Sequence, residues 1–471
     1  MTAAFDPTAA PAAAYRQGAS PSAVLVDADR EHRRSAAFAW LADLPPGSID
    51  AVALTFVDNA GIARVKTVPL SGLAHAAAWG VGMSPVFDAF LVNDSVAPAG
   101  TPDGDLRLLP DVDRLTMLAA QPGWAWAPVD RYTQEGLPYP GCQRLFARRM
   151  VEAAAELGCR AETGIEIEWA VGVEPEDEFV PATTAPAYGM GRLVELSEYC
   201  RDIHTALAAE DLPVLQLHPE YAAGQFEVST APMDPVAAAD VAVLTKETIR
   251  AVSVRHGLRA SFAPVVEAGA VGNGGHLHLS VHREGVPLFA GGEGPYGLTG
   301  AGESFVAGVL AELPALMAIG APSVASYLRQ VPSHWAGVYQ CWGWENREAA
   351  LRLVTGSTGE PGTPANVEVK CVDLSANPYL LVGAVLAAGL STLDKAVRLP
   401  AEVTGDPVGR DVPRLPQRLD TALTALADSV VLREALGESI FASFVDVRRA
   451  ELALFAESSP EQIVAATRWR Y

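Results

Sequence analysis

The alternation of residue types in one glycine-bordered segment constrains this chain most. His276, His278 and Ser280 alternate there with Leu277 and Leu279, directly after two glycines. Because successive side chains of a strand point to opposite faces, one face of this strand is apolar, while the other carries two imidazoles and a hydroxyl. Glycine beside such a strand allows a close approach of the backbone to another group. The pattern fits either a solvated edge strand or the wall of an active site.

Three further segments repeat the alternation and place polar residues on one face. These residues are Glu166 and Glu168 in segment 164–169, Gln225, Glu227 and Ser229 in segment 225–229, and Glu368 and Lys370 in segment 367–371. Each segment alone is most simply a half-solvated strand. Four of them in one region, with helical segments between, favour a curved sheet whose charged faces line its inside.

Such a sheet would bring together five carboxylates, those of Glu166, Glu168, Glu220, Glu227 and Glu368. Like charges raise one another's pKa values unless cations compensate them. Hard oxygen ligands suit Mg²⁺, and an imidazole among them also admits Mn²⁺. Two such ions suit phosphoryl transfer. Three arginines in one short stretch carry the planar guanidinium that suits phosphate and carboxylate oxygens, namely Arg329, Arg347 and Arg352.

Composition excludes several classes of function. The 471 residues are 49% hydrophobic with a net charge of −22, which predicts a globular chain of about two domains. An acidic surface disfavours nucleic acid and anionic membranes as partners. Five cysteines without a C-x-x-C pair indicate reduced thiols and a cytoplasmic location. The N-terminus lacks the basic and apolar regions of a signal peptide.

The chain divides into three parts by composition. Residues 1–20 are rich in alanine and proline and predict a disordered leader. Residues 21–125 predict a small α+β domain with a helix over 31–44 and a hairpin of 49–56 and 62–68 around an Asn/Gly turn. Residues 126–471 predict a larger domain. Its expected helices are 142–157, 191–210, 235–256, 302–319, 378–397 and most of 416–468.

In chain order, these motifs resemble those of the glutamine synthetase family, of the type I kind, over nearly the whole length. They read Glu166-Ile167-Glu168, His218-Pro219-Glu220, Gly224-Gln225-Phe226-Glu227, His276-Leu277-His278-Leu279-Ser280, Arg329-Gln330-Val331-Pro332, Asn346-Arg347 with Arg352, and Glu368-Val369-Lys370 with Asp373 and Asn377-Pro378-Tyr379-Leu380. The resemblance implies an α+β fold with an N-terminal β-grasp domain. It also implies a catalytic domain with a curved antiparallel sheet flanked by helices, and a homo-oligomer, expected as a dodecamer of two hexameric rings.

The resemblance also implies roles for single residues. One metal would be held by Glu168, Glu220 and Glu227, and a second by Glu166, His276 and Glu368, within a set of two or three Mg²⁺ or Mn²⁺ ions. ATP would contact His278 and Ser280, and its phosphates would contact Arg347 and Arg352. Arg329 would hold the α-carboxylate of the substrate, and the backbone of Gly272 its ammonium group.

The departures from the family pattern fall around the substrates. Trp335 occupies the position of the flap glutamate that binds ammonium, and a neutral indole neither pairs with that ion nor accepts its proton. The indole can pack on an alkyl amine or attract a cation through its ring, or a different acid near the flap takes over. Asp88 is the candidate for the second ammonium-site acid. Val271 replaces a substrate-binding asparagine, and Lys370 an arginine.

We therefore expect an ATP-dependent ligase that forms a γ-glutamyl amide through γ-glutamyl phosphate. The acceptor would be an organic amine, either a monoamine such as ethanolamine or a polyamine. One alternative is a glutamine synthetase that uses ammonium, and another is a ligase whose acid is not glutamate. A non-catalytic scaffold or regulator with the same fold is a third alternative, although such a protein has no reason to keep all six metal ligands.

Overall fold

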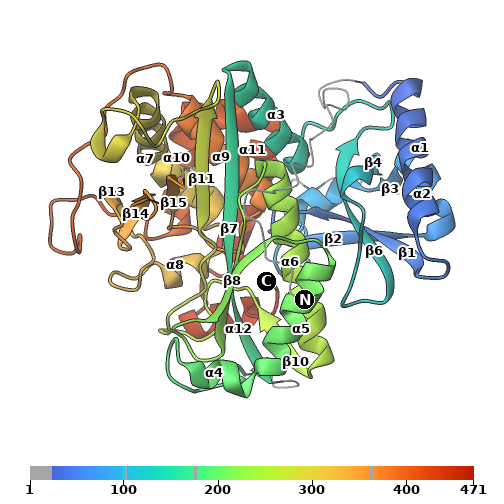
Figure 1. Cartoon of the computed structure of the whole chain (residues 1–471), viewed down its shortest axis with the longest axis horizontal. Helices are drawn as coiled ribbons and strands as arrows, with labels where there is room; N and C mark the ends of the chain where they lie inside the picture. The colour runs from blue at the N-terminus through green and yellow to red at the C-terminus, as the bar shows by residue number, and fades with distance from the viewer. Residues whose placement is uncertain (1–23, 99, 101–102, 174–177, 360–363) are drawn as a thin grey trace.

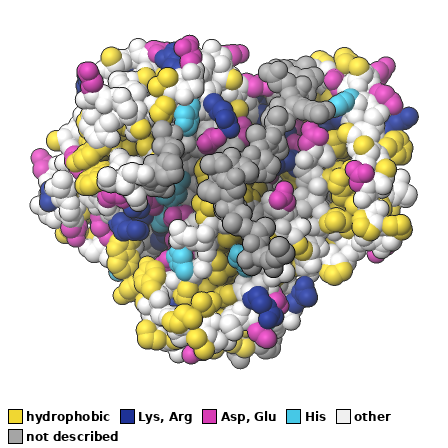
Figure 2. All heavy atoms as spheres, viewed as in Figure 1, with side chains coloured by type: hydrophobic (Ala, Val, Ile, Leu, Met, Phe, Trp, Pro, Cys, Tyr) yellow, Lys and Arg dark blue, Asp and Glu magenta, His cyan; other side chains and the backbone are white. Residues whose placement is uncertain are grey.

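The computed structural model describes residues 24–98, 100, 103–173, 178–359 and 364–471, and the expected leader over 1–20 lies outside them. Two mixed regions of helix and sheet lie side by side in Figure 1, the smaller one built from the N-terminal part of the chain. In the space-filling view, acidic and basic side chains are interspersed over the visible face (Figure 2).

The N-terminal domain is one sheet with the strand order β2-β1-β6-β4-β3, and β5 pairs with β6. Its strands are β1 (Ile49–Val57), β2 (Ala63–Pro69), β3 (Val81–Met83), β4 (Leu106–Pro110), β5 (Thr116–Met117) and β6 (Gly123–Tyr132). Helices α1 (Asp27–Asp43) and α2 (Leu73–Trp79) pack against each other, and α2 packs on β4. The hairpin expected over 49–68 is β1–β2. The N-terminal sheet extends past the expected boundary at residue 125, because that residue lies inside β6.

The hairpin turn is held by one side chain. The backbone N–H of Ile62 donates to Asp58 Oδ1 at 2.9 Å, and Arg64 Nε donates to Asp58 Oδ2 at 2.7 Å. Asp58 is fully buried, and burial raises its pKa although Arg64 opposes the shift. The Asn/Gly turn predicted from the sequence lies at the contact with the C-terminal domain, because Asn377 of that domain donates to the Val57 carbonyl at 2.9 Å.

The larger C-terminal domain, which is the expected catalytic domain, contains a nine-stranded sheet with the order β13-β14-β15-β11-β7-β9-β8, while β10 pairs with β7 and β12 with β11. Its strands are β7 (Cys159–Val173), β8 (Val214–Pro219), β9 (Gln225–Thr230), β10 (Leu258–Ser261), β11 (Leu277–Arg283), β12 (Val286–Pro287), β13 (Tyr339–Trp344), β14 (Ala349–Val354) and β15 (Asn366–Val369). Most neighbours run antiparallel, whereas β13 and β14 run parallel. The long strand β7 pairs with β11 along its first half and with β9 along its second.

Helices surround this sheet and bury its apolar face. They are α3 (Gln143–Glu156), α4 (Met190–Glu195), α5 (Ser197–Ala209), α6 (Pro235–Arg255), α7 (Gly300–Gly320), α8 (Ser326–Arg329), α9 (Pro378–Leu390), α10 (Leu419–Asp428), α11 (Val430–Leu454) and α12 (Pro460–Thr467). The helix expected over 191–210 is broken between α4 and α5, and the one expected over 378–397 ends at residue 390. Helix α7 is long and apolar enough to cross a membrane, but 83% of that apolar window is buried inside the fold.

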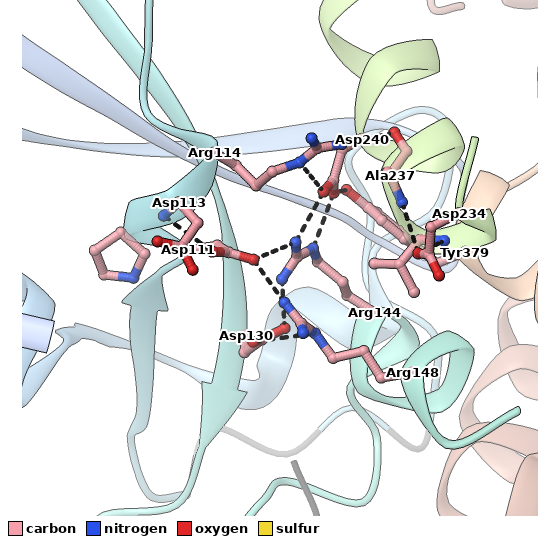
Figure 3. A network of polar contacts seen from close by, with 12 residues as sticks. Asp111, Asp113, Arg114, Asp130, Arg144, Arg148, Asp234, Ala237, Asp240 and Tyr379 are labelled. Carbon is pink, nitrogen blue, oxygen red and sulfur yellow. Dashed lines mark hydrogen bonds and ion pairs between the residues drawn. The ribbon is translucent and has the colours of Figure 1, made fainter. Parts of the chain in front are cut away.

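A buried network of charges joins the two domains (Figure 3). Arg144 of α3 donates to Asp111 at 2.7 Å, to Asp130 at 2.8 Å and to Asp240 at 2.8 Å. Asp111 and Asp130 belong to the N-terminal domain, whereas Asp240 lies on α6 of the catalytic domain. One guanidinium therefore compensates acids from both domains, and Tyr379 of α9 also donates to Asp240, at 2.7 Å.

Candidate active site

Two groups of potential metal ligands lie on the polar face of the catalytic sheet. The ligand atoms of Glu166, His276 and Glu368 all lie within 4.8 Å of one another, and the same holds for His218, Glu220 and Glu227. Glu166 lies on β7, Glu368 on β15 and His276 directly before β11, and these three strands are neighbours in the sheet. Strands β8 and β9 position the second. The alternating pattern read in the sequence thus produces two clusters rather than a solvated edge.

In the first cluster, Glu166 bridges two histidines. Its carboxylate lies 2.8 Å from His276 Nδ1 and 3.1 Å from His278 Nε2, and Glu368 Oε1 lies 3.2 Å from His276 Nδ1. Burial lowers the pKa of His278, but the charges of Glu166 and Glu368 and the hydrogen bonds to Glu166 and Asn366 together outweigh burial and raise that pKa to about 9. Burial raises the pKa of Glu166, yet the two imidazoles lower it below its usual range. The cluster therefore keeps an ionised carboxylate.

Glu368 also forms ion pairs with two cationic side chains. Lys370 Nζ donates to Glu368 Oε1 at 2.9 Å, and Arg352 Nη1 donates to Glu368 Oε2 at 3.2 Å. Burial raises the pKa of Glu368, but Lys370 and His276 lower it well below its usual value. The sequence placed Glu368 and Lys370 on one face, and the structure brings their charged groups together there.

The second cluster gathers Glu220 and Glu227 around His218. His218 faces Glu227 across the β8–β9 pair, with Nε2 at 3.5 Å from Glu227 Oε1 and Nδ1 at 3.5 Å from Glu220 Oε1. The hydrogen bond to Glu227 raises the pKa of His218 to about 9. His218 belongs to the motif His218-Pro219-Glu220, but no role was predicted for it from the sequence. The signal was its position two residues before Glu220, since alternate residues of a strand share a face.

Glu168, the third ligand predicted beside Glu220 and Glu227, lies next to this cluster. It faces Glu227 across the β7–β9 pair. Its Oε2 accepts from Gln225 Nε2 at 2.9 Å and from the backbone N–H of Gly274 at 2.9 Å. Burial raises its pKa, while His276 and Arg329 oppose the shift.

Gln225 ties Glu168 to the glycine-rich loop, a role that sequence reasoning missed. Its Nε2 also lies 3.0 Å from the Gly272 carbonyl and 3.0 Å from Asn273 Oδ1. An added Cβ at Gly274 would lie 2.7 Å from His276 Nε2 and 2.8 Å from Glu168 Oε1. A Cβ at this position would therefore lie between the two carboxylate clusters and force the ends of these side chains to move. Val271 is half-buried directly before this loop.

The residues predicted to bind the substrates differ in their surroundings. Arg329 of α8 is buried, with Nη2 at 3.1 Å from His276 Nε2, and its Nη1 has no hydrogen-bond partner among the described residues. A buried, unpartnered guanidinium nitrogen is costly and fits an anionic ligand. Arg352 is paired with Glu345 at 2.5 Å as well as with Glu368. Arg347 is exposed between β13 and β14, and Ser280 is half-buried in β11.

Asp88 does not join these residues within the chain. It is buried in the N-terminal domain, where Arg131 Nη1 donates to it at 2.5 Å and the hydroxyl of Tyr139 donates to it at 3.0 Å. Asp88 thus compensates a fully buried arginine. Trp335, by contrast, lies on the segment between α8 and β13 that borders the site, and its indole is 41% exposed.

The donor sets fit divalent cations and anionic substrates. Each cluster combines carboxylate oxygens with one imidazole, which suits Mg²⁺ or Mn²⁺. Arg329 lies between them with a free donor. Fold and site together define a metal-dependent enzyme that acts on small anionic molecules.

Comparison with known proteins identifies the family of this chain. Residues 140–465 match the family described as "Glutamine synthetase, catalytic domain". The chain is 55% identical over 443 residues to the gamma-glutamylpolyamine synthetase GlnA3 of Streptomyces coelicolor, covering 91% of this chain and 95% of that protein. A solved glutamine synthase homolog has a TM-score of 0.82 at 33% identity, covering 91% of this chain and 99% of that one. A GmaS/ADP complex has a TM-score of 0.78 at 28% identity, covering 90% and 96%.

This chain belongs to the glutamine synthetase family. The predicted fold, a β-grasp domain followed by a catalytic domain with a curled sheet, is confirmed. The protein is a carbon–nitrogen ligase of this family, as the sequence motifs predicted.

Proposed function

We propose that this ligase uses ATP to join the γ-carboxylate of glutamate to an organic amine, with a polyamine as the leading acceptor. The observation that carries the proposal is the 55% identity, over 95% of its length, to a protein named gamma-glutamylpolyamine synthetase. Trp335 supports the proposal, because the family resemblance places it at the position where ammonia-using members have the glutamate that binds ammonium. An indole offers an alkylamine contact area that ammonium does not need.

The proposed reaction has two steps. The γ-carboxylate of glutamate takes the terminal phosphoryl group of ATP, which releases ADP and converts a poor electrophile into an acyl phosphate. The amine nitrogen then attacks the acyl carbon, phosphate leaves, and the nitrogen loses one proton. Arg329 would hold the α-carboxylate with its unpartnered Nη1, and Arg347 and Arg352 would contact phosphate oxygens. His278 and Ser280 would contact the nucleotide.

Two or three Mg²⁺ or Mn²⁺ ions would supply charge neutralisation at the phosphates. One would be held by Glu166, His276 and Glu368, and another by Glu220 and Glu227 with Glu168 beside them. The structure adds His218 as a further donor to this second set. Gln225 and Gly274 fix the orientation of Glu168 through its Oε2 atom.

A phosphate-release assay over an amine panel tests the proposal. The panel contains ammonium, methylamine, ethanolamine, 1,4-diaminobutane and longer polyamines at saturating glutamate and ATP. We expect the diamines and polyamines to have the highest kcat/KM, with the amide product confirmed by mass. Ammonium as the best substrate would instead identify a glutamine synthetase, and no turnover with any amine would favour a scaffold. Replacing glutamate with other acids at fixed amine tests the acid specificity.

We also propose a homo-oligomer, a dodecamer of two hexameric rings, in the cytoplasm. Five free, buried cysteines support a reducing compartment. The assembly would place the N-terminal domain of one subunit against the catalytic domain of the next, as the family resemblance implies. Light scattering at assay concentration measures the assembly directly, and a monomeric mass with full activity would contradict it.

A further inference from the structure

The segment from Gln330 to Val338 carries unusual backbone conformations. Ser333, Trp335 and Gly337 have φ angles of 61°, 56° and 65°, in the left-handed region. Glycine adopts this region freely, whereas a residue with a side chain is strained there and stays only where its surroundings hold it. Some contact must therefore fix Trp335 in this position.

That contact is Glu348. The backbone N–H of Trp335 donates to Glu348 Oε1 at 3.0 Å. Glu348 is itself fixed, because its own N–H donates to Asn346 Oδ1 at 3.0 Å. The side chain of Asn346 is anchored in turn to the carbonyls of Val403 at 2.7 Å and Gly405 at 2.9 Å. A chain of hydrogen bonds thus runs from the body of the domain to Trp335.

The indole held in this way meets a second aromatic ring. The rings of Trp335 and Tyr221 are 5.2 Å apart between centroids, tilted by 57°, and Tyr221 is 45% exposed. Tyr221 directly follows Glu220 of the second carboxylate cluster, and its N–H donates to Glu220 Oε2 at 3.1 Å. The two rings therefore border that cluster from the β8–β9 loop and from the segment before β13.

The loop that carries Tyr221 is also held by hydrogen bonds to its backbone. Arg192 of α4 is buried, and its guanidinium donates to four backbone carbonyls, those of Ala185, Glu220, Tyr221 and Ala222. Both rings are thus held by backbone contacts, while their faces stay partly exposed. Partly exposed, pre-positioned aromatic rings are well suited to bind an amphipathic ligand.

We propose that Tyr221 and Trp335 form the wall that binds the methylene chain of the amine substrate, and that Glu348 is the positioning residue that holds Trp335 in it. The inference rests on the proposed amine ligase. It names the acceptor class as a diamine or polyamine, whose apolar chain lies on the rings and whose charged groups interact with the ring faces. Each methylene buried on such a wall strengthens binding roughly fourfold, which disfavours ammonium and methylamine.

The wall is tested by KM values for 1,4-diaminobutane. We expect Tyr221→Leu and Trp335→Leu each to raise this KM roughly tenfold, while the KM values for glutamate and ATP stay within about twofold. Trp335→Phe keeps a ring and should recover most of the affinity. The matched control is Tyr296→Leu, because Tyr296 is another exposed tyrosine stacked on a tryptophan, 5.0 Å from Trp344. An unchanged diamine KM in Tyr221→Leu overturns the inference.

Two substitutions separate a positioning role of Glu348 from proton transfer. Glu348→Gln keeps an oxygen that accepts the Trp335 N–H, whereas Glu348→Leu removes it. We expect Gln to retain kcat and the amine KM, and Leu to raise the amine KM as Trp335→Leu does. The Trp335 contribution to fluorescence, taken as the difference from the same variant carrying Trp335→Phe, should become more quenchable by acrylamide in Glu348→Leu.

The outcomes distinguish this inference from the proposed function. If Glu348→Gln loses kcat at every pH, Glu348 accepts the amine proton and the positioning role is overturned. If the wild-type enzyme prefers ammonium to every amine, the proposed function fails whatever the variants do. If the wild type prefers 1,4-diaminobutane and Tyr221→Leu keeps its KM, the function stands and the aromatic wall is overturned.

Discussion

Replacing Arg144 with methionine should lower the free energy of unfolding more than any substitution of an exposed charge, because Arg144 lies at the contact between the two domains. Arg144 is buried and donates to three buried acids, Asp111, Asp130 and Asp240 (Figure 3). Methionine is an unbranched, flexible side chain that fills much of the space without the charge. The substitution therefore removes the compensation of acids that belong to both domains.

The magnitude follows from what remains around each acid. Removing one partner of a buried ion pair costs about 3–5 kcal/mol. Asp111 keeps Arg148 at 2.6 Å, and Asp240 keeps Arg114 at 3.2 Å. Asp130 also keeps a contact with Arg148. Since none of the three acids is left alone, we expect the lower end of the range, about 3 kcal/mol.

Urea unfolding followed by tryptophan fluorescence, at one fixed protein concentration, measures this loss. With a slope of roughly 3 kcal/mol per molar urea, the midpoint should fall by about 1 M. The control is Arg160→Met, because Arg160 is 78% exposed in its pair with Glu162 and should shift the midpoint very little. Equal midpoints for the two variants would refute the reasoning.

The pH dependence gives a second check on Arg144→Met. Burial already raises the pKa of Asp130, and Arg144 opposes that shift. Without Arg144 the pKa of Asp130 rises further, so the folded state binds a proton that the unfolded chain, with its lower pKa, releases. The variant's deficit in unfolding free energy should therefore shrink as the pH falls from 7 towards 5. A deficit that grows over this interval would contradict the assignment.

Three shorter predictions follow from single sites. Gly274→Ala places a Cβ between the clusters and should weaken Mn²⁺ binding by roughly 10–100-fold in calorimetry, with an unchanged circular dichroism spectrum. Burial lowers the pKa of Lys246 to about 7. The buried amine therefore lowers the free energy of unfolding by its full amount below pH 7, and this destabilisation disappears towards pH 10. Lys246→Met should therefore raise the unfolding midpoint more at pH 6 than at pH 9. Asp88→Asn leaves Arg131 buried without its anion and should lower unfolding free energy by about 3–5 kcal/mol. A raised amine KM at unchanged stability would instead support Asp88 in the amine site.

Much of the fold was readable because its periodicity is local. Asn377 and Pro378 predicted the start of α9, and Asn377 Oδ1 does accept from the N–H groups of Tyr379 and Leu380. The end of that helix was missed, because the residues after Leu390 make a long-range contact in which Thr392 Oγ1 donates to the Ser304 carbonyl of α7 at 2.7 Å. The domain boundary at 125 was missed because β6 pairs in parallel with β1, a contact between residues about 70 positions apart. Long-range pairing leaves no local pattern.

The candidate site divides in the same way. The proximity of candidate ligands on alternating strands, such as Glu166 and Glu368, could be predicted because the residues that share one strand face can be identified from the sequence. Gln225 and His218 lay on the same faces, but their partners depend on which strands are neighbours. Glu348 lies in a turn, and nothing in its local sequence shows that it accepts the N–H of Trp335. Residues whose side chains hydrogen-bond to the backbone of another segment are therefore the ones whose role cannot be predicted from the sequence.

The same distinction explains how the substrate of such an enzyme can change while its chemistry stays. The two carboxylate clusters lie on or next to strands whose register is fixed by the sheet, so we expect a change there to disturb the proposed metal sites and the fold together. Trp335 and Tyr221 lie on connecting segments whose backbones are held by Glu348 and Arg192. Side chains on such held loops can be exchanged without moving the strands. We therefore expect differences in amine preference within this fold to concentrate on these two loops, and phosphoryl transfer to tolerate their substitution.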